Sequence, residues 1–181
     1  MPYFQTEGNV CWFYTVDWCF DRCQYEKMVE EFWEVETKKQ LQHLQKTLIS
    51  GSLDVATCGE LLADLTLDGR MKLHEHKKDY KEVLLHLLAA ELLGEPLFDL
   101  LKATKEEKNA IEIYIIALEI MWKAGNPKVK NVVHVTILER LSDEEAAWQE
   151  FGKYISDDFK RYINEEVLSC NFMMGCVKKL E

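Results

Sequence analysis

The residues with the clearest capacity for chemistry lie on a helix that we predict over residues 77–93. Asp79, Glu82 and His86 would share one stripe of this helix, because residues three, four or seven positions apart face the same side. Carboxylate and imidazole groups that project into a helical bundle can hold a metal ion, and Glu112 of another predicted helix would add a carboxylate. These four residues define our alternative hypothesis, a metal- or small-molecule-binding bundle with hydrolytic activity.

The leading expectation is that the chain holds no metal or cofactor and is not an enzyme. The Glu-x-x-x-His spacing differs from the Glu-x-x-His pattern of di-iron bundles. The sequence His74-Glu75-His76 lacks the HExxH spacing of zinc hydrolases, and the lysines around it predict a solvated loop. The sequence also contains no nucleophile elbow, glycine-rich phosphate loop or Walker lysine.

The elements that would position these residues are predicted to be helices. Four segments show the capping-box pattern, in which Ser, Thr or Asp is followed three residues later by Glu or Gln. They are Asp21–Gln24, Thr57–Glu60, Thr104–Glu107 and Ser142–Glu145. After Asp21, apolar residues recur at helical spacing as far as Leu48. This spacing predicts one long amphipathic helix that ends at Ser50-Gly51. The β-branched stretch 131–138 has no evident partner strand, so we predict a helix there as well.

The most buried element is predicted to be the helix over 108–124. Apolar residues occupy most of its circumference, so it should have neighbours on most sides. A further long helix after Ser142 carries Trp148, Phe151 and Phe159 on one face, with a kink at Ser156. We therefore expect an all-α, irregular multi-helix bundle of about six to eight helices. It would form a single domain over residues 1–181, with the aromatic-rich residues 1–20 packed on it or used for association.

The charge distribution indicates the kind of partner. The formal net charge is −10, and residues 1–36 contain eight acidic against two basic residues, while residues 142–166 contain eight against three. This argues against binding to nucleic acid or to an anionic membrane, because both attract clustered lysine and arginine, and it fits a basic protein partner. The absence of a basic leader and of a long apolar run, with six cysteines but no CxxC pair, leads us to expect a cytoplasmic protein with reduced thiols.

The residues expected to bind the partner are outward carboxylates of the last long helix and two aromatic anchors. The carboxylates are Glu145, Glu150, Asp157 and Asp158, and the anchors are Trp12 and Trp18. Concentrated carboxylates would raise the association rate toward a basic target, and tryptophan often dominates interface energetics. A homodimer that buries the aromatic N-terminus is a further alternative.

One stretch carries a family resemblance. VKNVVHVTILERLSDEEAAWQEFGKYISDDFKRYI, residues 129–163, resembles an uncharacterised family of small acidic helical bacterial proteins with a V-x-N-x-x-x-V-[ST]-x-L-E-x-L pattern. The matching residues are Val129, Asn131, Val135, Thr136, Leu138, Glu139 and Leu141. Some members are thought to be immunity partners of secreted toxins. The resemblance implies a helix for this stretch and a binding role, and it assigns no functional residue.

Overall fold

The computed structural model describes residues 22–103, 110–168 and 179–180, without the side chains of residues 22–26. Within these ranges the regular elements are helices, and the one pairing of strand type is an isolated bridge between Leu53 and Gly125. Segments that follow one another without a break make eight continuous helices in the described part of the chain. The prediction of an all-α, multi-helix arrangement is confirmed.

The elements, with π-helical turns labelled η, follow one another along the chain. They are α1 (Arg22–Thr47), α2 (Val55–Ala63), α3 (Gly69–Tyr80), α4 (Leu85–Ala89), η1 (Ala90–Gly94), α5 (Glu95–Lys102), α6 (Ile111–Ala124), α7 (Pro127–Val132), η3 (Val133–Leu138), α8 (Glu139–Ser142), α9 (Glu145–Phe151), α10 (Asp157–Tyr162) and η4 (Ile163–Val167). The β-branched stretch 131–138 is helical, as predicted, and runs through the end of α7 and the whole of η3.

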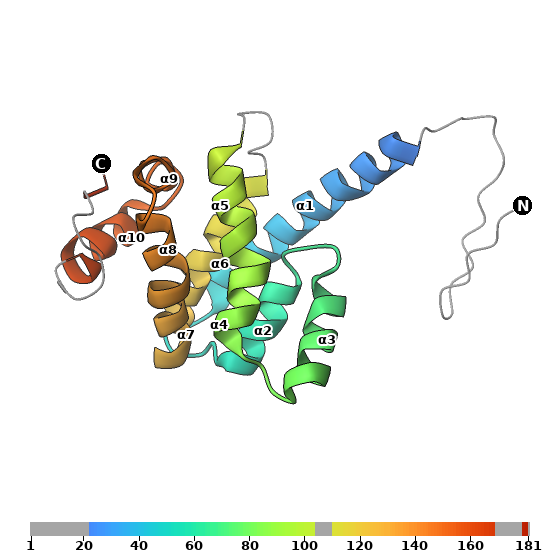
Figure 1. Cartoon of the computed structure of the whole chain (residues 1–181), viewed down its shortest axis with the longest axis horizontal. Helices are drawn as coiled ribbons and strands as arrows, with labels where there is room; N and C mark the ends of the chain where they lie inside the picture. Colours follow the sequence, from blue (N-terminus) through green and yellow to red (C-terminus); the bar gives the residue numbers. More distant parts are fainter. Residues whose placement is uncertain (1–21, 104–109, 169–178, 181) are drawn as a thin grey trace, which may run out of the picture.

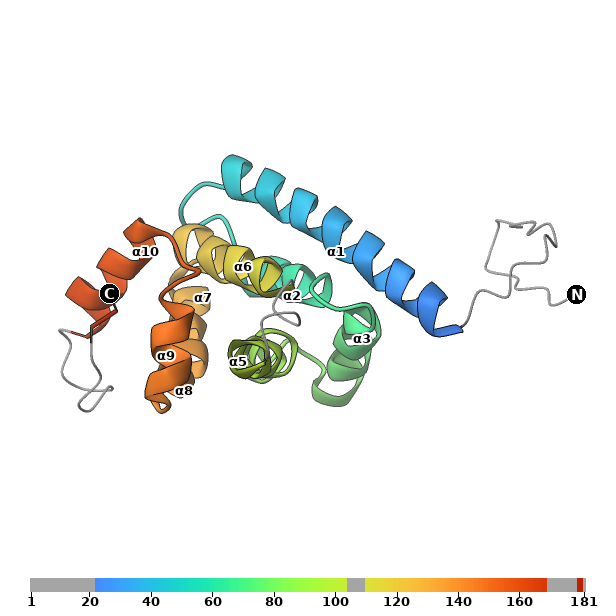
Figure 2. The same ribbon diagram turned by 90° about the horizontal axis from the view of Figure 1, so that it is seen from above.

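Helix α6 lies at the centre of the core, as predicted from its apolar circumference. Ten of its fourteen residues are buried, and one of them is an acidic residue, Glu119. Seen from above in Figure 2, α1 lies along one side of α6, and α4, α5 and α7–α9 lie on the other side. A helix covered on both sides loses most of its apolar surface to neighbours, which is why its sequence shows no wide polar face.

Helix α1 confirms the predicted long amphipathic helix, and it is tied to the core mainly through its second half, with Trp33 of the first half also packed against the core. Thr37 and Leu41 are buried, and Leu44 and Leu48 pack against the core from the same face. The first turns of α1 extend past the rest of the described chain (Figure 1). The chain turns away at Gly51, whose φ of +78° lies in the left-handed region that glycine adopts without strain.

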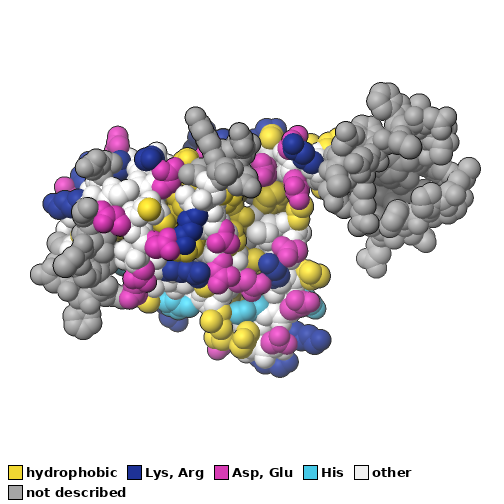
Figure 3. Space-filling view, turned by 45° about the horizontal axis from the view of Figure 1, so that its top comes forward, with side chains coloured by type: hydrophobic (Ala, Val, Ile, Leu, Met, Phe, Trp, Pro, Cys, Tyr) yellow, Lys and Arg dark blue, Asp and Glu magenta, His cyan; other side chains and the backbone are white. Residues whose placement is uncertain are grey.

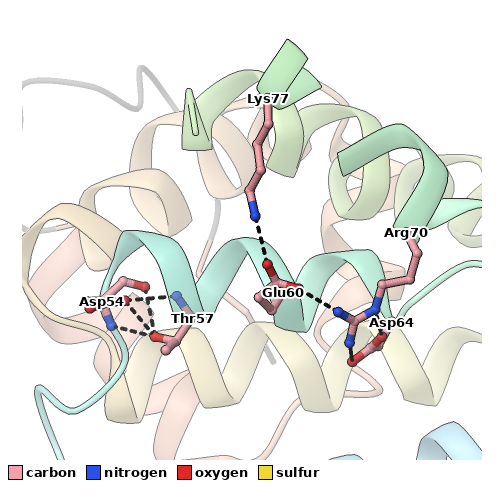
Figure 4. Close-up of polar contacts among 6 residues, drawn as sticks. All are labelled: Asp54, Thr57, Glu60, Asp64, Arg70 and Lys77. Atoms are coloured by element: carbon pink, nitrogen blue, oxygen red, sulfur yellow. Dashed lines mark hydrogen bonds and ion pairs between the residues drawn. The ribbon is translucent and has the colours of Figure 1, made fainter. Parts of the chain in front are cut away.

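Helix α2 begins one turn before the predicted Thr57–Glu60 box. Asp54 is its N-cap residue: Asp54 Oδ1 accepts the Thr57 backbone N–H at 2.8 Å, and the Thr57 hydroxyl accepts the Asp54 backbone N–H at 3.0 Å (Figure 4). Thr57 thus plays the reciprocal part that the prediction gave to Glu60. The predicted box was wrong because Asp54, three positions earlier, is the residue that caps the helix.

Glu60 instead joins α2 to α3. Its carboxylate accepts from Lys77 at 2.8 Å and also binds Arg70, whose guanidinium makes two parallel hydrogen bonds to Asp64 at 2.6 and 2.7 Å (Figure 4). Exposed ion pairs of this kind contribute little stability individually, on the order of 0–1 kcal/mol. Their main consequence is that Arg70 and Lys77 of α3 are neutralised by carboxylates of α2 and of the residue that follows it.

The predicted helix over 77–93 is wrong, because the chain breaks after Tyr80. Lys81 adopts a left-handed conformation with φ of 62°, and α4 begins only at Leu85. The His74-Glu75-His76 segment is also helical instead of a solvated loop, since it lies inside α3. His76 is buried and its Nε2 accepts the backbone N–H of Leu84 at 3.0 Å, so this side chain fixes the break.

The predicted long helix after Ser142 is two helices. Ser142 is the last residue of α8, where its hydroxyl donates to the Glu139 carbonyl at 2.6 Å, so it does not cap α9. A break after Phe151 separates α9 from α10, and Ser156 caps α10 by accepting the Phe159 backbone N–H. The kink expected at Ser156 is therefore a helix start. The other two predicted boxes, at Asp21 and Thr104, lie outside the described residues.

Candidate partner-binding surface

An aromatic layer holds α9 and α10 against the core. Phe159 lies against Trp122 of α6, with ring centroids 4.7 Å apart, and meets Phe151 of α9 edge-on at 6.4 Å. Tyr162 lies 5.2 Å from Trp122 and places its hydroxyl 2.6 Å from Nε2 of His134. With their apolar faces committed to this layer, the two helices have their charged residues on the other sides.

A buried carboxylate sets the break between the two helices. Glu119 of α6 is only 5% exposed, and its Oε1 accepts the backbone N–H of Ser156 at 2.7 Å. Its Oε2 accepts from Gln45 of α1 at 3.3 Å, and Lys123 lies 3.9 Å away. A buried charge is tolerated when several partners satisfy it. Glu119 therefore links α1, α6 and the start of α10.

Three of the four predicted carboxylates occupy the first turns of α9 and α10. Glu145 is exposed at the start of α9, and Asp157 and Asp158 are exposed at the start of α10. Negative charges at helix N-termini interact favourably with the helix dipole, so these residues also stabilise their own helices. Glu150 differs, because it is half-buried near the end of α9 and accepts from Lys153 at 2.6 Å.

Basic neighbours divide the surface into separate acidic groups. Asp158 pairs with Arg161 at 2.7 Å, and Glu144 pairs with Lys102 of α5 at 2.7 Å. Acidic and basic side chains are accordingly interspersed on the face shown in Figure 3. The sequence predicts a concentrated carboxylate surface. In the described residues, the surface is acidic but interrupted by ion pairs.

Sequence reasoning missed several residues of this surface. Glu144 was not predicted as a site residue, although it borders Glu145, because its pairing with Lys102 joins residues 42 positions apart. Glu165 and Glu166 are exposed in η4, in the same chain segment as the predicted acids. The local excess of acidic residues in 142–166 was the signal that could have included them. Trp12 and Trp18 lie outside the described residues.

The residues of the metal hypothesis are spread over separate elements. Asp79 lies in α3, Glu82 in the connection that follows it, His86 in α4 and Glu112 in α6, where it pairs with Lys38 of α1. Among residues 22–103, 110–168 and 179–180, no group of three or more His, Cys, Asp and Glu side chains is arranged to hold a metal ion. The premise that the first three share one helical stripe fails at the break after Tyr80.

His86 has a different set of neighbours from the one predicted. Its Nδ1 lies 2.6 Å from the Thr136 hydroxyl, and its Nε2 lies 3.4 Å from Nδ2 of Asn131. Thr136 and Asn131 are the two polar residues of the resemblance pattern that precede its glutamate. They join α4 to α7 and η3, which is a structural role that the pattern alone did not reveal.

The one described cysteine side chain is not poised for chemistry. Burial, with a smaller contribution from the charge of Asp54, raises the pKa of Cys58 to about 12. A thiol in this environment is neutral near pH 7 and is a poor nucleophile or metal ligand. Cys58 is a free thiol in the apolar core, next to Leu61 and Leu62 in α2.

Comparisons with known proteins bear on the family of the chain. Among the described residues, no helix combines the length and the apolar character that crossing a bilayer requires. No match is found among curated proteins, and none among solved structures. A family model described as a domain of unknown function, DUF7674, matches residues 60–169, which include α3 to α10 and the stretch 129–163. The chain therefore belongs to the DUF7674 family.

Proposed function

We propose that this protein is a non-enzymatic, cytoplasmic binding protein that recognises a basic protein partner through the surface of α8–α10 and η4. The observation that carries the proposal is the exposure of Glu145, Asp157 and Asp158 above a fixed aromatic layer. Pre-organised charges bind better than mobile ones, because less conformational freedom is lost on association. The buried Glu119–Ser156 contact supplies this rigidity at the start of α10.

The charge of the surface supports a basic partner. Residues 139–168 contain nine acidic and four basic residues, so the described ion pairs leave an excess of negative charge. Such an excess raises the rate of encounter with a positively charged surface and is screened by salt. Arginine and lysine side chains of the partner would compete with Lys153 and Arg161 for their carboxylates, which gives specificity to partners with matching geometry.

We infer from the resemblance over 129–163 that the partner is a secreted toxin, whose working surface would be covered on binding. Occlusion would require no chemistry from this chain. Co-expression with a toxin encoded beside it should protect the host cell. Loss of protection in the triple variant Glu145→Lys, Asp157→Lys and Asp158→Lys would connect protection to the acidic surface.

The proposal is tested by reversing the charge of the surface. The triple variant Glu145→Lys, Asp157→Lys and Asp158→Lys should lose capture of a partner from native lysate, and the wild-type interaction should weaken as salt is raised. With the captured partner in hand, association and dissociation rates should show that the variant acts mainly on the association rate.

A matched control makes the same charge change on another face. Glu75→Lys, Asp79→Lys and Glu82→Lys alter exposed residues of α3 and of the connection after it. The control should bind like wild type if position matters and not only net charge. The proposal fails if no partner is captured, if binding is indifferent to salt, or if both triple variants bind equally.

A further inference from the structure

Helix α1 carries two apolar stripes on opposite sides. The inner stripe includes Leu41 and Leu44, which pack toward α6. The outer stripe consists of Met28, Phe32 and Val35, whose spacing of four and three residues keeps them on one line of the helix. These three side chains are 51%, 72% and 54% exposed, respectively. A helix that is apolar on two sides usually has a neighbour on each side.

The outer stripe faces away from the rest of the described chain. At about 100° per residue, Phe32 lies about 180° around the helix from Leu41, and Val35 lies about 120° from it. Figure 2 shows α1 at the edge of the molecule, with the other helices on one side only. No described residue between 27 and 36 is buried. No described part of the chain therefore covers the outer stripe, along its whole length.

We propose that the outer stripe of α1 is a self-association surface, on which the same stripe of a second copy lies antiparallel. Met28, Phe32, Val35, Lys39 and Gln42 follow at steps of four, three, four and three residues, which is the spacing of a coiled-coil seam. In an antiparallel pair, Phe32 of each copy lies against Val35 of the other. Met28 of each copy then lies against the aliphatic stem of Lys39 of the other, whose ammonium group reaches solvent.

The charged residues beside the seam favour this antiparallel register. Glu31 and Lys38 occupy the same flank of the stripe, so in the antiparallel register Glu31 of each copy meets Lys38 of the other, in two equivalent pairs. A shift by one heptad in either direction would place Lys38 opposite Lys38, or Glu31 opposite Glu31. The register that joins the apolar residues is thus also the one that joins opposite charges.

A parallel pair is disfavoured by the same residues. It would place Lys39 opposite Lys39 within the seam and Glu31 beside Glu36 on the flank. The whole of α1 has the matching asymmetry, because its acidic residues in the described part end at Glu36 and its lysines from Lys38 to Lys46 follow. Antiparallel association brings the acidic half of one helix to the basic half of the other.

Three features of the protein bear on the strength of this association. Glu34 has a raised pKa because of partial burial and the nearby charges of Glu30 and Glu31, so the acidic half of α1 repels itself. Lys38 already pairs with Glu112 of its own chain, and it is exposed enough to bridge that carboxylate and Glu31 of the second copy. The seam has few apolar layers, so it should bury less surface than the roughly 1,200–2,000 Å² of a stable protein–protein interface. The dimer should therefore be weak and dependent on concentration.

The surface is independent of the proposed partner-binding surface. In Figure 1 the first half of α1 and the helices α9 and α10 lie at opposite ends of the molecule. A dimer through α1 would leave both acidic surfaces accessible. Loss of self-association therefore need not affect partner binding, and the two proposals can fail separately.

Sedimentation equilibrium of the full chain over a wide concentration range tests the proposal. Wild type should pass from monomer to dimer, and Phe32→Glu should raise the dissociation constant by about tenfold or more, because it buries a charge in each central layer. Lys39→Leu should lower the constant by completing an apolar layer. As a control, Leu87→Glu alters a side chain of α4 that is as exposed as Met28, and it should leave the dissociation constant unchanged.

Two matched charge changes test the direction of pairing. Glu31→Lys should raise the dissociation constant by roughly threefold or more, because it replaces two attractive contacts with two repulsive ones, whereas Glu36→Lys should have little effect. The double variant Glu31→Lys with Lys38→Glu should restore association. A monomer at every concentration, or a dimer indifferent to Phe32→Glu, overturns the proposal. A dimer strengthened both by Glu36→Lys and by Glu31→Lys overturns the antiparallel arrangement, because a parallel pair places these two residues beside each other.

Discussion

Helices α1 and α6 are both rich in apolar residues at helical spacing, yet their surroundings differ. Helix α6 is buried over most of its circumference, between α1 on one side and α5 and α7 on the other. Helix α1 buries one stripe against α6 and leaves Met28, Phe32 and Val35 exposed. The family match includes α6 and begins after α1. Apolar spacing thus identifies a helix, whereas only the fold shows whether another element packs against each apolar stripe.

The largest expected difference between the two stripes is in stability. Leu41 is 2% exposed, so Leu41→Ala should reduce the free energy of unfolding by about 2–5 kcal/mol through lost burial and a residual cavity. Phe32→Ala removes more atoms from the same helix but should change this free energy by less than about 0.5 kcal/mol. Urea unfolding at low protein concentration, where the chain is monomeric, measures both. Similar losses for the two variants would mean that the outer stripe is covered within the monomer.

The second expected difference is between two glutamates, one buried on α6 and one exposed on α1. Glu119→Ala should cost about 1–3 kcal/mol, because the Ser156 backbone N–H would lose its acceptor in a buried setting. Glu119→Gln keeps an acceptor oxygen and should cost less. Glu31→Ala should cost almost nothing in the monomer. Thermal unfolding of the three variants makes the comparison, and it is contradicted if Glu119→Ala is as stable as Glu31→Ala.

The smallest expected effect is a pH dependence of the stability, which arises from His134. Burial lowers the pKa of His134, with nearby Lys130 adding to the effect and Glu166 opposing it, so the folded protein favours the neutral imidazole that faces the Tyr162 hydroxyl. The resulting stability is present above the ordinary histidine pKa of about 6.5 and is lost as the pH falls through the lowered value. His134→Gln should reduce this loss. Unfolding midpoints between neutral and mildly acidic pH measure it, and identical profiles for both proteins would remove His134 as the cause.

Much of the fold could be predicted because it depends on local patterns. The extent of α1, the burial of α6 and the apolar face of α9 and α10 all follow from apolar residues at helical spacing. The choice of helix for 131–138 was correct because no partner strand exists in the described residues for its backbone groups. In these segments, local preference and tertiary packing agree.

The errors arise where a distant contact decides the local structure. The apolar spacing of 77–93 continues smoothly across the break after Tyr80, and only the hydrogen bond from Leu84 to the buried His76 reveals why the helix ends. Nothing in the sequence around Glu119 indicates its partner, because the Ser156 backbone N–H comes from a helix start 37 residues away. Contacts at such separations leave no trace in spacing or propensity.

The candidate surface was predicted in composition but not in arrangement. The excess of acidic residues in 142–166 is visible from the sequence, and Glu145, Asp157 and Asp158 are exposed. The pairing of Glu144 with Lys102 depends on α5 lying beside α9, which required the fold. Charge counts therefore indicate a kind of partner, whereas the structure decides which carboxylates are already engaged.

Amide hydrogen exchange along α1, followed at low and at high protein concentration, tests most directly whether the two stripes differ as described. We predict that residues 37–47 are protected at both concentrations, because they are anchored on α6. Residues 27–36 should exchange rapidly when dilute and gain protection as concentration rises. Equal and concentration-independent protection along the whole helix would contradict the account.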